Sequence, residues 1–385
     1  MSWIIPENKL DISIRTIIDR FDVNNNVCIK GFLKTGKTLC IMHLIRKSIC
    51  LNHTSKVLLL VLGRLEVEYF KMVCQELGIR INIDTYFHFK KNPNKYDRIF
   101  CDDVQNITAS TLTIIKENAG HVIVSINPDL KLLCVDFSSD EETLTTGQVI
   151  NILSPTICEL NLFHGKTNVN ALSKIVSGTD KCFQPKYNNT KQHTRIRLCK
   201  AQEDMAENEY IFREVKNILN VGHSIGVFFP TNNDVIAFTQ YFIQLEGMES
   251  WEAKKNIWGK PDFPDLNHYL VKNELPLQIL SNYCGEFREI NNKINVMTYY
   301  NSKGVYFDYV FMPYLNSILF INANEQISRN LFVMAATRCH YSLFLSYTGY
   351  MHRFLYEIKD ECIQIDIENT LNGQYYNRDN IFAGF

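Results

Sequence analysis

The chain has 385 residues, of which 46% are hydrophobic and 21% charged, and its formal net charge is -1. This length allows two compact domains with separate cores, and the composition is that of an ordinary globular protein rather than a disordered or fibrous one. Because the net charge is close to zero, any basic track for nucleic-acid phosphates must be local.

The 12 cysteines are scattered along the chain, with no CxxC pair and no His/Cys group at metal-ligand spacing. We therefore expect neither a zinc site nor a disulfide framework, and a reducing cytosol is the simplest setting. No apolar run approaches the roughly 20 residues that cross a bilayer, and the polar start MSWIIPENK does not have the shape of a signal peptide. The sequence predicts a cytoplasmic protein without a membrane partner.

The first half of the chain alternates short β-type runs with helical stretches. The runs are residues 27–29, 57–62, 98–101 and 122–126. This alternation is typical of an α/β fold with a parallel sheet and helices on both faces. The polar segment SSDEETLTTGQ, residues 138–148, then interrupts the pattern and is interpreted as a linker or loop.

The alternation resumes in the second half. Its β-type runs are residues 225–229, 278–280, 294–297, 310–312 and 343–346. We expect two lobes that join near residue 150, one formed by residues 1–150 and the other by residues 151–385. An irregular piece with two tryptophans marks a small insertion at about residues 245–270, which either packs onto its own lobe or meets a partner.

The segment GFLKTGKTLC, residues 31–40, fits the P-loop pattern, with Gly31, then four residues that end in Thr35, then Gly36, Lys37 and Thr38. A P-loop binds phosphates with backbone N–H groups at a helix N-terminus, and a lysine ammonium adds a point charge. The expected ligand is ATP with Mg²⁺, Lys37 lying on the β and γ phosphates and Thr38 on the metal. The alternative is a glycine turn without a ligand.

A second motif, RIFCDDVQNIT at residues 98–108, is a strand that ends in two acids. Asp102 is placed to bind Mg²⁺, and Asp103 is placed to act as a general base on the attacking water. Without the P-loop upstream, such a pair would be interpreted as a helix cap or a solvated turn.

The sequence DDVQN resembles motif II of superfamily 1 helicases of the UvrD/Rep type, which reads Asp-Glu-x-Gln. The resemblance implies that Asp102 binds the metal, Asp103 is the base, and Gln105 orients water or couples the site to its surroundings. Asp103 is one methylene shorter than the family's glutamate. Since a shift of about 1 Å in a catalytic group costs on the order of 100-fold in rate, hydrolysis is expected to be slow.

Two segments of the second half extend this resemblance. VMTYYNSKGVYFDYVFMP, residues 296–313, is similar to motif V, and NLFVMAATRCHYSLFLSY, residues 330–347, is similar to motif VI. The resemblance implies two RecA-like lobes, with Arg338 as an arginine finger on the γ phosphate and Gly304 allowing the backbone to approach it. It also implies that Thr298 and Tyr300 contact the nucleic acid.

The weaker match DTYFHF, residues 84–89, resembles the T-F-H-S motif and points to Thr85 and Tyr86 as nucleic-acid contacts. Its aromatic cluster is either core or a stacking platform for bases. Further candidates for phosphate contact, which are otherwise a solvated surface, are Lys90, Lys91, Lys95 and Arg98 in one loop and Arg195 and Arg197 in another.

The chain also departs from the family pattern. Ile14 stands where an adenine-reading Gln is expected, Tyr306 replaces the motif V Glu, and Gly165 stands where motif IV has a phosphate-contacting Arg. In motif III, Asn127 and Leu130 replace a polar coupling pair. The intervals before motifs II and V are too short for the large 1B and 2B subdomains of the long helicases.

The leading hypothesis is an ATP-dependent translocase or helicase on single-stranded DNA, with RNA as an alternative substrate. A second hypothesis is a degenerate helicase that binds nucleotide as a switch within a larger complex, for example beside a nuclease or other effector in defence against phage. A P-loop kinase for a small molecule is the third.

Overall fold

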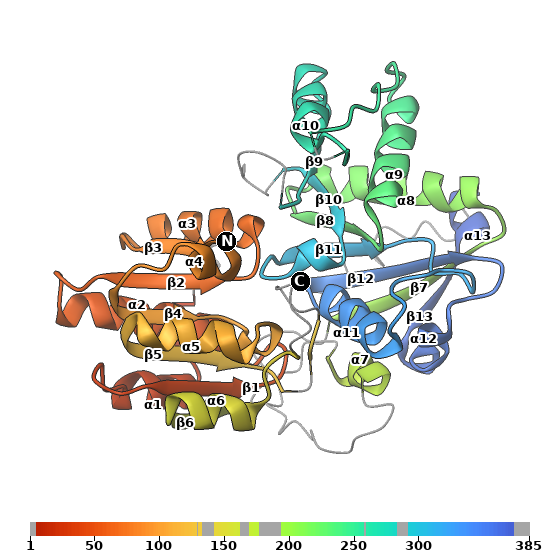
Figure 1. The fold of residues 1–385 in the computed structure, drawn as a ribbon. Coiled ribbons are helices and arrows are strands. Elements are labelled where there is room, and N and C mark those ends of the chain that lie inside the picture. The colour runs from red at the N-terminus through yellow and green to blue at the C-terminus, as the bar shows by residue number, and fades with distance from the viewer. Residues whose placement is uncertain are drawn as a thin grey trace. The chain divides into compact units, whose positions relative to one another are not determined.

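The computed structural model describes residues 5–128, 130–132, 142–161, 169–176, 194–257, 259–282 and 292–372. Within these ranges the chain forms two compact units, the first made of the described residues up to 161 and the second of those from 169 onward. Each unit is built on its own parallel sheet, with six strands in the first and seven in the second (Figure 1). The expected α/β class with two RecA-like lobes is confirmed.

The sheet of the first unit has the strand order β3-β2-β4-β5-β1-β6, with every pair parallel. The order places β5 between β1 and β4, so the ends of these three strands lie next to one another. The strands are β1 (Val27–Gly31), β2 (Val57–Val61), β3 (Asn82–Thr85), β4 (Tyr96–Cys101), β5 (Ala119–Ile126) and β6 (Thr156–Leu160).

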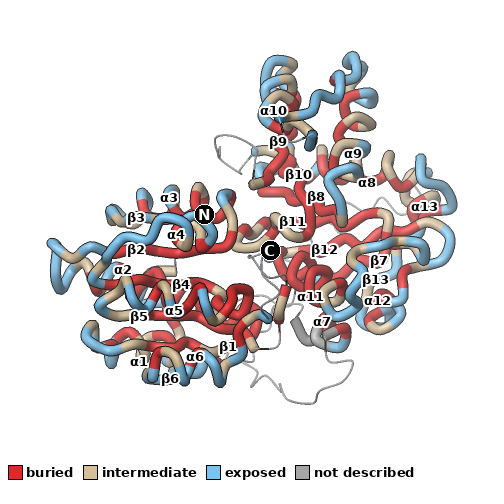
Figure 2. The backbone as a smooth tube through the Cα atoms, viewed as in Figure 1, coloured by how far each residue is buried: buried red, intermediate tan, exposed pale blue. Residues whose placement is uncertain are grey.

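The central strands of this sheet are buried on both faces (Figure 2). In β2, Leu58 and Leu60 face the layer that contains α4, α5 and α6, and the alternate residue Leu59 faces the other side. Burial on both faces explains why these strands are continuous apolar runs, as parallel sheets require. The helices are α1 (Ile12–Arg20), α2 (Lys37–Leu51), α3 (Arg64–Glu76), α4 (Tyr86–Lys91), α5 (Ala109–Glu117) and α6 (Thr146–Leu153).

The described part of the expected linker belongs to the first unit. Thr145 caps α6, and Leu144 and Val149 pack into the core beside β4 and β5. The following strand, β6, pairs with β1, so the first unit extends beyond residue 150. The sequence of residues 138–148 suggests a linker or loop because it is mostly polar, and its few apolar residues do not indicate which side of a helix or strand is buried.

The sheet of the second unit has the order β13-β7-β12-β11-β8-β10-β9, again with parallel pairs. Its strands are β7 (Arg195–Ala201), β8 (Ile225–Phe229), β9 (Leu277–Ile279), β10 (Ile294–Thr298), β11 (Phe307–Met312), β12 (Cys339–Thr348) and β13 (Ile363–Asp366). Its helices are α7 (Val169–Val176), α8 (Asp204–Asn220), α9 (Asn232–Leu245), α10 (Phe263–Lys272), α11 (Glu325–Ala336), α12 (Arg353–Tyr356) and α13 (Ile367–Leu371).

The irregular piece between α9 and α10 packs onto its own unit. Trp251 is 4% exposed, and its indole N–H donates to Asp265 Oδ2 at 2.8 Å. Its backbone N–H donates to the side-chain oxygen of Gln240 at 3.1 Å, so the segment is held to both helices. Trp251 therefore confirms the first interpretation of this insertion, which is that it packs onto its own lobe.

A buried carboxylate lies in the same unit, on the inner face of α8. Glu207 is fully buried, and its Oε1 accepts hydrogen bonds from the Tyr314 backbone N–H at 2.8 Å and from the Ser346 hydroxyl at 2.6 Å. Burial raises the pKa of Glu207 from 4.5 to about 7, and the two hydrogen bonds only partly oppose this shift. The second unit therefore holds an acid whose charge is costly at neutral pH.

Candidate nucleotide-binding site

The P-loop sequence folds into a tight turn from the end of β1 to the start of α2. Lys34 and Gly36 have φ angles of 57° and 83°, in the left-handed region, and Gly36 is the N-cap of the helix. The first N–H groups of α2 lack partners within the helix and carry the positive end of its dipole. The turn therefore has the geometry that binds phosphate groups.

Gly31 is required by close packing. A Cβ at this position would lie 2.5 Å from Thr35 Oγ1 and 2.9 Å from the carbonyl oxygen of Leu160. The second of these atoms belongs to the backbone of β6 and cannot rotate away. Any larger residue would therefore displace either the loop or the edge strand.

Two side chains of the loop point back onto its own backbone. The Lys37 ammonium donates to the Phe32 carbonyl at 2.8 Å, and the Thr35 hydroxyl donates to the same carbonyl at 2.8 Å. Lys37 is only 8% exposed. Its charge is thus held over the turn, where a triphosphate would lie.

The P-loop helix is joined to the acidic strand end by a short contact. The Thr38 hydroxyl donates to Asp102 Oδ2 at 2.8 Å, and the Ser125 hydroxyl donates to Asp102 Oδ1. A hydroxyl and a carboxylate at this separation are the oxygen ligands that Mg²⁺ takes from proteins when phosphates and waters supply the rest. Thr38 and Asp102 would hold the ion. In the part of the chain that the structure describes, no group of three or more His, Cys, Asp or Glu could hold a metal.

Asp103 lies beside this pair with an unusual backbone. Its φ is 59° and its ψ is 52°, and its N–H donates to Ser125 Oγ at 2.8 Å. Such a conformation costs free energy in a residue other than glycine and tends to occur at functional sites. Ser125 therefore fixes both acids at once, although no sequence motif points to it.

Gln105 is 1% exposed and connects two segments. Its Nε2 donates to Asp103 Oδ1 at 3.1 Å, and its Oε1 accepts the Asn127 N–H at 2.9 Å. Of the two roles considered for Gln105, this geometry fits coupling. The second of these hydrogen bonds uses the backbone N–H of Asn127, so it does not depend on the side chain at that position. Leu130, which replaces the other coupling residue, is buried.

The expected nucleic-acid contact at Tyr86, in the aromatic cluster after β3, is contradicted by the structure. Tyr86 is 1% exposed and packs in the core, and its hydroxyl donates to the Asp102 carbonyl at 2.8 Å, so it is not a stacking platform. The next residue, Phe87, is 47% exposed, and the Lys91 ammonium lies 4.1 Å from its ring centroid. Thr85 caps α4 by accepting the His88 N–H at 3.2 Å.

Two arginines of the expected basic loops are also placed differently from the prediction, because they have structural roles. Arg98 lies on β4, where it is 8% exposed and donates to the Val23 carbonyl and to Ser55. Arg197 lies on β7, where it is 6% exposed and donates to Ser342. A track for nucleic-acid phosphates must lie on the surface, so neither arginine belongs to it. Lys91, Lys95 and Arg195 are exposed.

The residues that resemble motif V lie at and after the end of β10 in the second unit. Thr298 ends the strand, and Tyr300 begins a short 3-10 turn, Tyr300–Ser302. Gly304 has a φ of 78°, which favours glycine. The sequence-predicted residues of this motif thus lie close together, between the end of β10 and residue 304.

Arg338 lies between the end of α11 and the start of β12. It is 5% exposed, and its Nε donates to the Met334 carbonyl at 3.0 Å. Its guanidinium carbon lies 4.7 Å from the centroid of the Tyr306 ring. Within the described ranges, Arg338 forms no ion pair.

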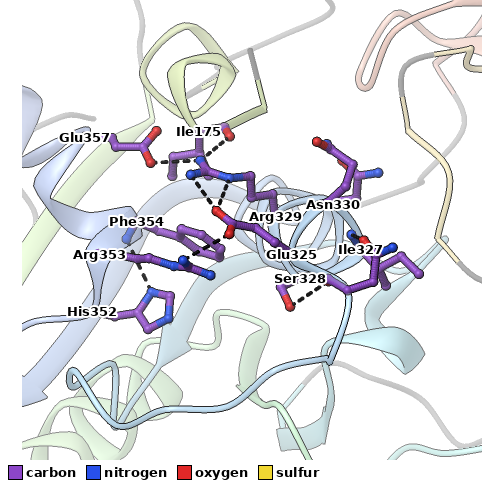
Figure 3. Close-up of polar contacts among 12 residues, drawn as sticks. Ile175, Glu325, Ile327, Ser328, Arg329, Asn330, His352, Arg353, Phe354 and Glu357 are labelled. Carbon is purple, nitrogen blue, oxygen red and sulfur yellow. Dashed lines mark hydrogen bonds and ion pairs between the residues drawn. The ribbon is translucent and has the colours of Figure 1, made fainter. Parts of the chain in front are cut away.

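An ion-pair network holds the start of α11 (Figure 3). Arg329 contacts Glu325 at 3.0 Å and Glu357 at 2.8 Å, and it donates to the Ile175 carbonyl of α7 at 2.8 Å. Arg353 contacts the other oxygen of Glu325 at 3.0 Å. These contacts fix the helix that Arg338 follows by two residues.

Two more positions differ from the helicase pattern that the sequence resembles, Ile14 and Gly165. Ile14 is fully buried in α1 and presents no polar atom to a base. The motif IV segment that contains Gly165 lies outside the described residues.

In the described part of the chain, no helix is long and apolar enough to span a bilayer. No protein-family model matches the chain. No curated protein matches it either. Among solved structures, it is similar to the C-terminal domain of a possible DNA helicase from Lactobacillus plantarum WCFS1, with 11% identity and a TM-score of 0.34, over 53% of this chain and 98% of that domain. At this similarity the match defines no activity.

Proposed function

We propose that the protein is an ATP-dependent translocase or helicase of the superfamily 1 type that acts on single-stranded DNA. The observation that carries the proposal is the linked set Thr38–Asp102–Ser125–Asp103, which includes the last residue of the P-loop and follows Lys37 directly. A hydroxyl, a carboxylate and a second acid on the adjoining residue are the groups that Mg-dependent hydrolysis of a nucleoside triphosphate needs.

In the reaction, a water oxygen bonds to the γ phosphorus, and the bond from that phosphorus to the β–γ bridging oxygen breaks, which yields ADP and phosphate. Asp103 takes the proton from the water, and Gln105 holds Asp103 in place. Bound Mg²⁺ would neutralise charge on the phosphate oxygens. Lys37 would pair with the β and γ phosphates, and the N–H groups of the P-loop would orient them.

In the proposed reaction, Arg338 would act as the arginine finger that the resemblance implies. A guanidinium at the γ phosphate stabilises the charge that develops in the transition state, and such residues contribute roughly 10³ to 10⁵ in rate. Gly304 would let the backbone approach the same phosphate.

Single-stranded DNA would contact Thr85, Thr298 and Tyr300, as the resemblance implies. Phe87, rather than the buried Tyr86, would stack on the bases, since its ring is exposed and a lysine lies beside it. An aromatic ring accepts any base, so this contact would not select a sequence.

A nucleotide-gated switch is the second candidate. It is favoured by the buried Ile14, which removes the expected base contact, and by the shorter base at Asp103. In that role the protein would bind ATP, hydrolyse it slowly, and change its contact with an effector such as a nuclease in the cytoplasm.

Steady-state phosphate release tests the first proposal, measured with ATP alone and with single-stranded DNA, duplex DNA or RNA. We expect stimulation by single-stranded DNA, loss of hydrolysis in Lys37→Ala, and a drop of about 10³ in Arg338→Ala. Lys272→Ala, at an exposed lysine of α10 that the proposal places in no site, is the matched control. Hydrolysis that survives in Lys37→Ala would reject the site, and unstimulated slow turnover would favour the switch.

A further inference from the structure

The residues that precede β11 and β12 lie side by side in the second unit. Phe307 pairs with Cys339, and the Phe307 N–H donates to the Arg338 carbonyl at 2.9 Å. Tyr306 and Arg338 each stand one residue before these partners. Because side chains alternate along paired strands, Tyr306 and Arg338 share one face of the sheet.

The two side chains form a stack with a third. The Arg338 guanidinium lies over the Tyr306 ring at 4.7 Å, and Tyr306 stacks on His340 with centroids 5.5 Å apart and an angle of 24°. The pairing of β11 with β12 is irregular here, since Tyr309 pairs with Ser342 and β12 carries one extra residue. Such a bulge redirects side chains, and it lies where His340 meets Tyr306.

The stack holds the guanidinium without using its hydrogen-bond donors. A cation lies on a ring face through the ring's quadrupole, so the N–H groups, which lie in the guanidinium plane, are left to point elsewhere. The Nε is bound to the Met334 carbonyl, which sets the rotation of the plane. A carboxylate partner would instead engage the terminal nitrogens, which are the groups that bind a phosphate bidentately.

We propose that Tyr306, backed by His340, is a positioning residue for Arg338. The ring fixes the guanidinium plane and leaves its terminal nitrogens for the triphosphate, at the position where the resembling helicases have a glutamate. This inference rests on the proposed ATP hydrolysis and adds a residue to it.

The test compares Tyr306→Leu, which removes the ring, with Tyr306→Phe, which keeps it, in the full-length protein. We expect Tyr306→Leu to lower kcat by about tenfold with KM for ATP unchanged, because the phosphates are bound mainly by the P-loop. Tyr306→Phe is expected to retain wild-type kcat. Tyr350→Leu, the same change at a tyrosine that is 80% exposed, is the matched control and should leave kcat unaltered.

A double-mutant cycle with Arg338→Ala separates positioning from general stability. When the arginine is absent, adding Tyr306→Leu should change kcat by less than about twofold. A further tenfold loss in that background, or a Tyr306→Leu enzyme with wild-type kcat, would overturn the positioning role and leave the proposed hydrolysis intact. A wild-type protein without any ATP hydrolysis would overturn both proposals.

Discussion

Replacing Ser125 by alanine removes one hydroxyl from the centre of the candidate site. Ser125 is fully buried on β5, where it donates to Asp102 Oδ1 and accepts the Asp103 N–H at 2.8 Å. The substitution leaves an N–H without its acceptor and a carboxylate oxygen without its donor. It leaves no bulky cavity, so the effect on packing is small.

Two effects follow from these contacts, and they differ in size. An unsatisfied buried polar group costs about 1–3 kcal/mol, so the free energy of unfolding should fall by roughly that amount. Asp103 is held with a positive φ by the lost hydrogen bond, and relaxation would move its carboxylate. A displacement of about 1 Å corresponds to a loss on the order of 100-fold in kcat.

The assay pairs phosphate release with chemical denaturation, and Ser342→Ala is the control. Ser342 is also a buried serine on a central strand, and its hydroxyl accepts a hydrogen bond from Arg197 at 3.1 Å. Both variants should lose stability, and only Ser125→Ala should lose kcat. Wild-type kcat in Ser125→Ala, or equal losses of kcat in the two variants, would refute the reasoning.

Three further predictions follow from single contacts. Gly31→Ala places a Cβ 2.9 Å from the Leu160 carbonyl oxygen, so the protein should lose about 1–3 kcal/mol of stability in denaturant titrations and bind ATP more weakly. Phe87→Ala should weaken binding of single-stranded DNA by about 1–3 kcal/mol in fluorescence anisotropy, whereas Tyr86→Phe should leave that affinity unaltered and lower only stability. Glu207 has a pKa raised by burial from 4.5 to about 7, so its folded form holds a proton that the unfolded form has lost, and stability should fall as pH rises from about 4.5 to 7. In Glu207→Gln this fall in the free energy of unfolding with pH should vanish. The variant should also be more stable than the wild type above pH 7, by on the order of 3 kcal/mol. Denaturant titrations across pH in which the variant keeps the wild-type pH dependence would contradict the assignment to Glu207.

The sequence by itself determined the features that depend on neighbouring residues. The P-loop needs a left-handed glycine and a lysine at fixed spacing, and Gly36 and Lys37 supply them within one turn. The strand at residues 225–229 was predicted with its observed bounds, because a continuous apolar run is the local signature of a strand buried on both faces. Other strands, such as β3 and β13, were missed because they are short and largely polar at the sheet edges.

Only the tertiary structure decided which distant residues share the site and which aromatic ring is exposed. Ser125 meets Asp102 because β5 lies between β1 and β4, and strand order is set by pairing across the whole sheet rather than by nearby residues. Tyr86 is buried and Phe87 is exposed because α4 turns one face to the core, and two adjacent aromatics look alike until that face is known. The same holds for Tyr306, whose contact with Arg338 depends on the register of two strands that are joined through a separate helix.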